Sequence, residues 1–152
     1  MNVVIRTDAS TRIGLGHLAR CRTLATALRD QGAAVRFICR THPGHQIAAL
    51  RAESFNVAAL PAPPDQEAAD GDYAAWLGVP QDQDAAETVG TLIAPRPDWL
   101  IVDHYGLDAA WEQALRPHVD RILVIDDLAN RPHDGDLLLD QNYAPAGANR
   151  YQ

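Results

Sequence analysis

A histidine that follows two closely spaced glycines is the residue best suited to acid–base chemistry. The segment Ile13-Gly14-Leu15-Gly16-His17 separates an apolar run at the N-terminus from a stretch with helical periodicity. Glycines let the backbone approach a ligand closely, and the free N–H groups at a helix start favour an anionic or oxygen-rich ligand. An imidazole, with an ordinary pKa near ~6.5, can accept a proton at neutral pH. We therefore predict that His17 is a general base and that Gly14 and Gly16 contact the substrate.

Two other interpretations of this glycine segment stay open. The glycines could form only a tight loop that His17 caps. Gly14, Gly16 and Ala19 also match the spacing of a dinucleotide-binding fingerprint. The glycines lie far from the preceding strand, however, and Arg40 stands where that motif has an acid, so the fit to an NAD site is poor.

Polar residues follow three of the predicted strands. Residues 8–10 (Asp-Ala-Ser), 103–106 (Asp-His-Tyr-Gly) and 126–127 (Asp-Asp) each come after an apolar run. In a doubly wound sheet, ligands bind beyond the carboxyl ends of the strands, so these residues are expected to face one crevice. They could bind a ligand, or they could be helix caps and turn residues. Four other histidines are predicted to be solvated loop residues: His42, His45, His118 and His133.

Apolar runs alternate with helical segments along the chain, which predicts an α/β fold. The strands lack polar alternation, which implies a Rossmann-like, doubly wound parallel sheet covered on both faces. Residues 61–72, rich in proline and acidic side chains, are predicted to be a loop, and residues 148–152 an irregular tail. Helices are expected over residues 17–29, 46–52, 85–94 and 109–115, and strands over residues 3–5, 35–39, 57–60, 99–102, 122–125 and 137–139.

Composition argues against several classes of function. The 152 residues suit one globular domain, and a net charge of −7 with only 13 Lys and Arg argues against a nucleic-acid partner. No apolar run approaches the ~18 residues of a membrane span, and the N-terminus lacks the pattern of a secretory signal. Cys21 and Cys39 suggest neither a disulfide framework nor a zinc site. The expected location is the cytoplasm.

Several motifs occur in a fixed order along the whole chain. They are residues 6–10 (Arg-Thr-Asp-Ala-Ser), 13–17, 20–21 (Arg-Cys), 103–106, 126–127, 131–134 (Arg-Pro-His-Asp) and 139–142 (Leu-Asp-Gln-Asn). In this order they resemble the UDP-2,4-diacetamido-2,4,6-trideoxy-β-L-altropyranose hydrolases of pseudaminic acid biosynthesis. One position departs from the pattern, because Gly135 stands where that family often has cysteine.

The resemblance implies one half of a glycosyltransferase-B type fold, similar to the peptidoglycan glycosyltransferase MurG. Residues 1–145 would be the Rossmann-like N-terminal catalytic domain, and residues 146–152 the start of a linker to a C-terminal nucleotide-binding domain in cis. The catalytic histidine of the family falls on His17, and the tyrosine expected beside the sugar falls on Tyr105. Further substrate-binding residues are predicted to be Asp8, Gly14, Gly16, Arg20, Asp103, His104 and Asn142.

The resemblance also implies hydrolysis without a metal or other cofactor. Water would attack the anomeric carbon of the UDP-sugar, and UDP would leave with C–O cleavage and inversion. Ordinary inverting glycosidases need an acid for a poor leaving group, but UDP leaves readily, so one base can suffice. A chain without the nucleotide-binding half is expected to turn over poorly. Two alternatives are a glycosyltransferase of the same fold, and a metal-dependent hydrolase that uses Asp103, His104, Asp126 and Asp127 as ligands.

Overall fold

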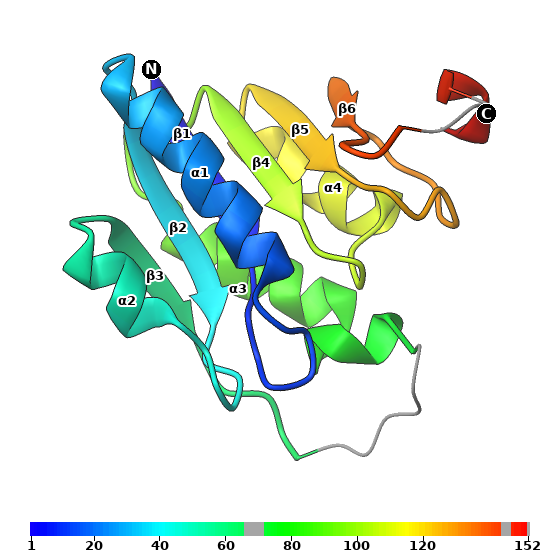
Figure 1. Ribbon diagram of the computed structural model, residues 1–152, viewed down its shortest axis with the longest axis horizontal. Helices are drawn as coiled ribbons and strands as arrows, with labels where there is room; N and C mark the ends of the chain where they lie inside the picture. Colours follow the sequence, from blue (N-terminus) through cyan, green and yellow to red (C-terminus); the bar gives the residue numbers. More distant parts are fainter. Residues whose placement is uncertain (66–71, 144–146, 152) are drawn as a thin grey trace.

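The computed structural model describes residues 1–65, 72–143 and 147–151, which form one six-stranded parallel sheet (Figure 1). The strand order is β3-β2-β1-β4-β5-β6, and each neighbouring pair is parallel. The predicted Rossmann-like α/β fold is confirmed. The strands are β1 (Asn2–Thr7), β2 (Ala34–Arg40), β3 (Asn56–Leu60), β4 (Trp99–Asp103), β5 (Arg121–Ile125) and β6 (Leu137–Leu139).

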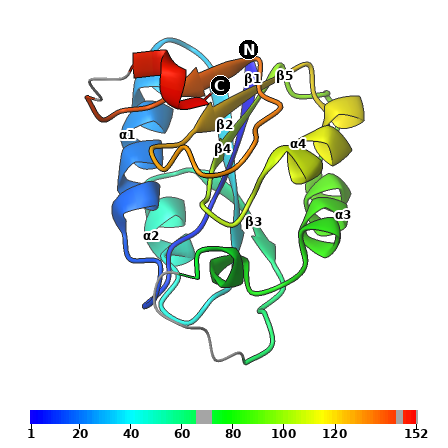
Figure 2. The same cartoon turned by 90° about the vertical axis from the view of Figure 1, so that its right-hand side faces the viewer.

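Helices cover both faces of the sheet (Figure 2). Helices α1 (Gly16–Asp30) and α2 (Ile47–Ala52) lie on one face, and α3 (Gln81–Thr91) and α4 (Ala109–Leu115) lie on the other. A separate core of buried apolar side chains fills each interface, one around Phe37 and one around Trp111. Polar residues are therefore absent from the middle of the two central strands, β1 and β4, because helices cover both of their faces.

Helix α3 occupies a different range from the one its sequence pattern predicts. It runs over Gln81–Thr91, whereas the apolar pattern indicated residues 85–94. Pro80 occupies the N-cap position, and Asp82 and Asp84 lie in the first turn. Acidic side chains stabilise the positive end of a helix, so they belong to the helix although they break its apolar pattern.

Short 3-10 helices account for two further differences. Residues 61–65 form no regular structure, as predicted, and residues 66–71 of the expected loop lie outside the described residues. The helix η1 (Ala74–Leu77) that follows was not predicted, and buried Leu77 anchors it in the core. The prediction of an irregular tail is wrong, because η3 (Gly147–Tyr151) forms there. Tyr151 donates a hydrogen bond to the carbonyl of Asp126 at 2.7 Å. A third, η2 (Arg116–His118), follows α4.

The carboxyl ends of β1 and β4 meet where the strand order reverses. From β1 the sheet continues through β2 to β3, and from β4 through β5 to β6. Thr7 pairs with Asp103 in the parallel register, so the loops that follow β1 and β4 start side by side. Doubly wound folds bind ligands at such a switch point. The fold therefore brings Asp8 and Asp103, which are distant in sequence, to one edge of the sheet.

A fully buried ionic network joins the ends of β1 and β2 to helix α3. Asp84 of α3 accepts hydrogen bonds from Arg6 and Arg40 at 2.7 Å each, and from the indole of Trp111 at 3.0 Å. Arg6 also donates to Asp8 at 2.6 Å. Burial alone would raise the pKa of Asp84, but the charges and hydrogen bonds of the two arginines outweigh it and lower that pKa. Sequence patterns did not predict this network.

Replacing Asp84 with Asn should strongly destabilise the fold. The change would leave the buried charges of Arg6 and Arg40 without their shared partner, and breaking a buried pair in this way costs about 3–5 kcal/mol. The free energy of unfolding in urea measures the loss. Asp82→Asn is the matched control, because Asp82 is exposed on the same helical turn and should change stability by no more than about 0.5 kcal/mol. Equal effects of the two changes would contradict a structural role for the network.

Candidate active site

His17 contacts the carboxylate of Asp103 at the N-terminus of α1. The helix begins at Gly16, and its first turn places His17 over the end of β4. Nδ1 of His17 lies 2.6 Å from Oδ1 of Asp103, and both side chains are buried. Because an ionised carboxylate only accepts hydrogen bonds, Nδ1 carries the hydrogen. The other ring nitrogen, Nε2, then has the lone pair that can accept a proton.

Arg20 and Cys21 hold the same carboxylate from the next turn of α1. Arg20 donates to both oxygens of Asp103 at 2.6 Å, which is a bidentate pair, and the Cys21 thiol donates to Oδ2 at 3.3 Å. Burial alone would raise the pKa of Asp103, but hydrogen bonds from Arg20 and His17 outweigh it and lower that pKa. Nη2 of Arg20 also lies 3.1 Å from Nδ1 of His17, but both atoms are donors there. Asp103 therefore stays ionised and fixes the orientation of the imidazole.

Tyr105 lies directly beside the His17 ring. The two ring centroids are 4.3 Å apart and nearly perpendicular, and the phenol donates to Asp127 at 2.5 Å. Burial and the Asp127 carboxylate raise the pKa of Tyr105 to about 12. Asn142 donates to the other oxygen of Asp127 at 2.8 Å. Tyr105 and Asn142, both predicted to act at the site, are thus joined through Asp127, one of the polar residues that the sequence places after a strand.

Two further aromatic side chains, Trp76 of η1 and Tyr73 just before it, complete a cluster around Tyr105. Trp76 stacks on Tyr105 with centroids 5.8 Å apart, and Tyr73 lies edge-on to both rings. Trp76 also lies edge-on to His17, with centroids 6.4 Å apart. Neither residue was predicted, because both follow a segment without helical or strand periodicity. Two aromatic residues close together after such a segment were the one sequence feature that could have indicated a contact with ligand.

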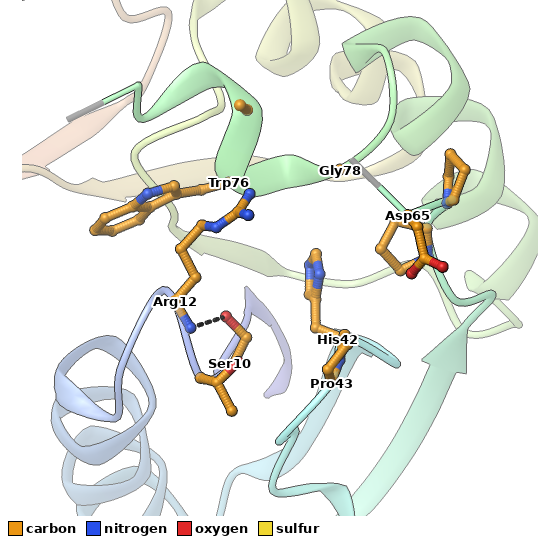
Figure 3. Close-up of a pocket in the computed structure, with 11 residues that line it drawn as sticks. Ser10, Arg12, His42, Pro43, Asp65, Trp76 and Gly78 are labelled. Atoms are coloured by element: carbon orange, nitrogen blue, oxygen red, sulfur yellow. Dashed lines mark hydrogen bonds between the residues drawn. The ribbon is translucent and has the colours of Figure 1, made fainter. Parts of the chain in front are cut away.

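A cavity of about 340 Å³ adjoins this cluster (Figure 3). The loops after β1, β2 and β3 form it together with η1. His17 does not line the cavity, but Trp76 does, so this indole belongs both to the cavity wall and to the aromatic cluster beside His17. The lining includes Ser10, Arg12, His42, Pro63, Asp65 and Gly78.

Two residues predicted to bind substrate lie beneath the site. Asp8 is fully buried and accepts hydrogen bonds from Arg6 and from the backbone N–H of Arg40. Nε2 of His104 and Nε2 of His42 each lie 3.3 Å from its second oxygen. Burial would raise the pKa of Asp8, yet the charge of Arg6 and the two histidines hold it well below its usual range. The backbone N–H of Gly106 donates to Nδ1 of His104, so the contacts of Asp8 and His104 are made within the protein.

The two glycines of the first loop have different roles. Gly14 adopts a φ of +77°, which favours glycine, and its N–H donates to the carbonyl of Ser10 at 2.9 Å. Gly14 therefore turns the loop and has no free N–H for a ligand. Gly16 is the first residue of α1, where N–H groups lack partners within the helix.

The prediction of solvated histidines is wrong at two of the four positions. His42 is buried beside Asp8, and the side chain of His133 is 6% exposed and bonded to Glu112 at 2.7 Å. Each of the two side chains contacts a buried carboxylate from a distant part of the sequence. The polarity of the neighbouring residues cannot predict such a contact. The other two, His45 and His118, are exposed as predicted.

The alternative metal-ligand set is not assembled. Within the described ranges, no group of three or more His, Cys, Asp and Glu side chains is placed to hold a metal ion. Asp103 is hydrogen-bonded to Arg20, His104 is hydrogen-bonded to the N–H of Gly106, and Asp126 lies 2.7 Å from Arg131.

No helix in the described part of the chain is long and apolar enough to cross a membrane.

One characterised relative is distantly similar to this chain. The UDP-2,4-diacetamido-2,4,6-trideoxy-β-L-altropyranose hydrolase of Campylobacter jejuni is 28% identical over 148 residues. The match covers 96% of this chain but 44% of that protein, so the chain spans less than half of its relative's length. No protein-family profile matches the chain. The chain is thus a Rossmann-like parallel α/β domain with distant similarity to a UDP-sugar hydrolase.

The Tyr105 phenol should ionise only near pH 12. Its absorbance change is obtained by alkaline titration as the difference between the wild-type chain and Tyr105→Phe. The midpoint should be about 12 rather than the ordinary ~10, because burial disfavours the phenolate and ionisation would place a second negative charge beside Asp127. Asp127→Asn should lower the midpoint toward ~10. A midpoint near the ordinary value in the wild type would contradict the contact.

Proposed function

We propose that this chain is the catalytic part of an enzyme that hydrolyses a UDP-linked diacetamido-trideoxy sugar and releases UDP and the free sugar. The observation that carries the proposal is the His17–Asp103 contact at the topological switch point, with Nδ1 2.6 Å from the carboxylate. The similarity to a UDP-sugar hydrolase supports this choice of substrate. The product would feed pseudaminic acid synthesis in the cytoplasm.

The proposed reaction needs one proton acceptor. A water molecule attacks the anomeric carbon while its proton passes to Nε2 of His17, and the bond between that carbon and the UDP oxygen breaks with inversion. Asp103 stabilises the imidazolium that forms, in the way that a buried carboxylate does in other His-based sites. UDP needs no protonation to leave, and the free N–H groups of the first turn of α1 favour the developing negative charge.

Arg20 and Tyr105 act around this base. The bidentate bond to Asp103 makes Arg20 a positioning residue for His17, rather than the direct substrate ligand that the sequence suggested. Tyr105, held by Asp127, places a neutral hydroxyl and an aromatic face beside the base. Asn142, exposed at the other side of Asp127, is proposed to contact the substrate from the rim.

We further propose that a second, nucleotide-binding domain in cis completes the site. Residues 1–145 would be the N-terminal catalytic domain, and residues 146–152 would begin the linker. The match covers 44% of the length of a relative that is a UDP-sugar hydrolase, which leaves room for a second domain in that protein. Holding the nucleotide is what orients the reacting carbon, and such positioning accounts for a large part of the rate of most enzymes.

A UDP-release assay tests the proposed function. The substrate is the UDP-linked diacetamido-trideoxy altrose, offered to this chain and to a form extended by the second domain, each with and without a chelator. The extended form should release UDP at equal rates in both conditions, and the short chain should be slow. UDP release that requires an added sugar or lipid acceptor would instead indicate a glycosyltransferase, and loss of activity in the chelator would indicate a metal-dependent hydrolase.

His17→Asn and His17→Leu should abolish most turnover in the extended form. Removing a general base typically costs a factor of about 10²–10⁴ in kcat, whereas KM should change little because His17 acts on the water. Tyr105→Phe should be milder, since its hydroxyl positions the sugar without transferring a proton. His118→Asn is the control, because His118 is exposed on η2. A His17 variant that retains wild-type kcat would refute the assignment of the base.

A further inference from the structure

We propose that the cavity beside Trp76 is the subsite for an acetamido group of the sugar. This inference rests on the proposed function, and it names the part of the substrate that the cavity accepts. The cavity volume of about 340 Å³ lies at the small end of the ~300–1,000 Å³ typical of ligand pockets. It therefore suits a sugar substituent or a single ring, and not a whole nucleotide sugar.

Ser10 offers a hydrogen-bond donor to the cavity. Its hydroxyl oxygen already accepts hydrogen bonds from the backbone N–H groups of Arg12 at 3.1 Å and Ile13 at 2.8 Å. A serine hydroxyl has two lone pairs and one hydrogen, so these contacts use its acceptor capacity and leave the O–H. The side chain is therefore set to donate to a ligand, and a carbonyl oxygen is the complementary group.

His42 offers a hydrogen-bond acceptor on the same cavity. Its Nε2 lies 3.3 Å from the ionised carboxylate of Asp8, which places the hydrogen on Nε2. Among the described residues, Nδ1 of His42 has no hydrogen-bond partner, and Figure 3 shows this ring pointing into the cavity. With its hydrogen on Nε2, the ring presents a lone pair at Nδ1, for which an amide N–H is the complementary group.

Besides the charged side chains of Arg12 and Asp65, much of the remaining wall is apolar. Pro43, Pro63 and Pro64 line the cavity, together with Ala75 and the indole of Trp76. Proline has no backbone N–H, so these walls favour a methyl group over water. An acetamido group combines an N–H donor, a carbonyl acceptor and a methyl group. A plain hydroxyl of a sugar has no methyl group and would leave these apolar walls uncovered.

Trp76 links this subsite to the proposed base. The same indole lines the cavity and lies edge-on to His17, with centroids 6.4 Å apart. A sugar anchored by its acetamido group on one side of Trp76 would thus keep its ring beside His17. Trp76 is accordingly assigned as a specificity-determining residue that touches the substrate.

Binding can be tested on this chain without turnover. The chain has three tryptophans, so its indole N–H region in a ¹H–¹⁵N spectrum is simple, and Trp76→Phe identifies the Trp76 signal. N-acetylglucosamine should shift that signal, and glucose, which lacks the acetamido group, should not. No shift with N-acetylglucosamine, or an equal shift with glucose, would overturn the proposal.

Two alanines of η1 provide matched variants. Ala75 lines the cavity, so Ala75→Leu should fill it. The affinity for N-acetylglucosamine, measured from the shift of the Trp76 signal, should fall by about tenfold or more. Its neighbour Ala74 is exposed and does not line the cavity, so Ala74→Leu should respond as the wild type does. An Ala75→Leu chain that responds like the wild type would also overturn the proposal.

Kinetics separate this inference from the proposed function. In the extended form, Ala75→Leu should lower kcat/KM for the diacetamido substrate by about tenfold or more, mainly through KM, while Ala74→Leu leaves it unchanged. If the wild type releases UDP and Ala75→Leu is unimpaired, the subsite is wrong and the function stands. If the wild type releases no UDP but the acetamido-dependent shift is present, the function is wrong and the subsite stands.

Discussion

The arrangement of the site depends on one buried carboxylate. Asp103 accepts hydrogen bonds from His17, Arg20 and Cys21, all from the first two turns of α1, and it is fully buried. A buried charge is costly unless such partners surround it, so the helix, the strand and the orientation of the imidazole are fixed together. The position of the proposed base is therefore a consequence of how α1 packs against the end of β4.

The fold supplies the conditions for that contact at two levels. The reversal of strand order places the ends of β1 and β4 side by side, and the buried network of Arg6, Arg40 and Asp84 ties β1 and β2 to α3 beneath them. On the other side of the site, the aromatic cluster depends on η1, which Leu77 anchors in the core. Rigid elements thus carry both His17 and Trp76, as a site that must position a substrate requires.

Local sequence patterns predicted the sheet, the presence of four helices and the polar residues at the carboxyl ends of the strands. They succeeded because apolar periodicity reflects burial, and because polar residues after buried strands mark the open edge of a parallel sheet. They failed where a partner is distant in sequence. Asp84 precedes the helix expected over residues 85–94 and so was not singled out, and His42 was predicted to be a loop residue, yet each contacts charged groups that the fold brings together. Trp76 was missed because the short helix that carries it has no periodicity to detect.

The tautomer of His17 tests the central claim most directly. A ¹H–¹⁵N correlation of the imidazole nitrogens at about pH 8, above the ordinary imidazole pKa of ~6.5, reports which nitrogen carries the hydrogen. His17→Asn identifies the signals. The hydrogen should be on Nδ1, bonded to Asp103, with Nε2 free to accept a proton. A hydrogen on Nε2, or an equal mixture of both tautomers, would contradict the account, because neither leaves a base held in place by Asp103.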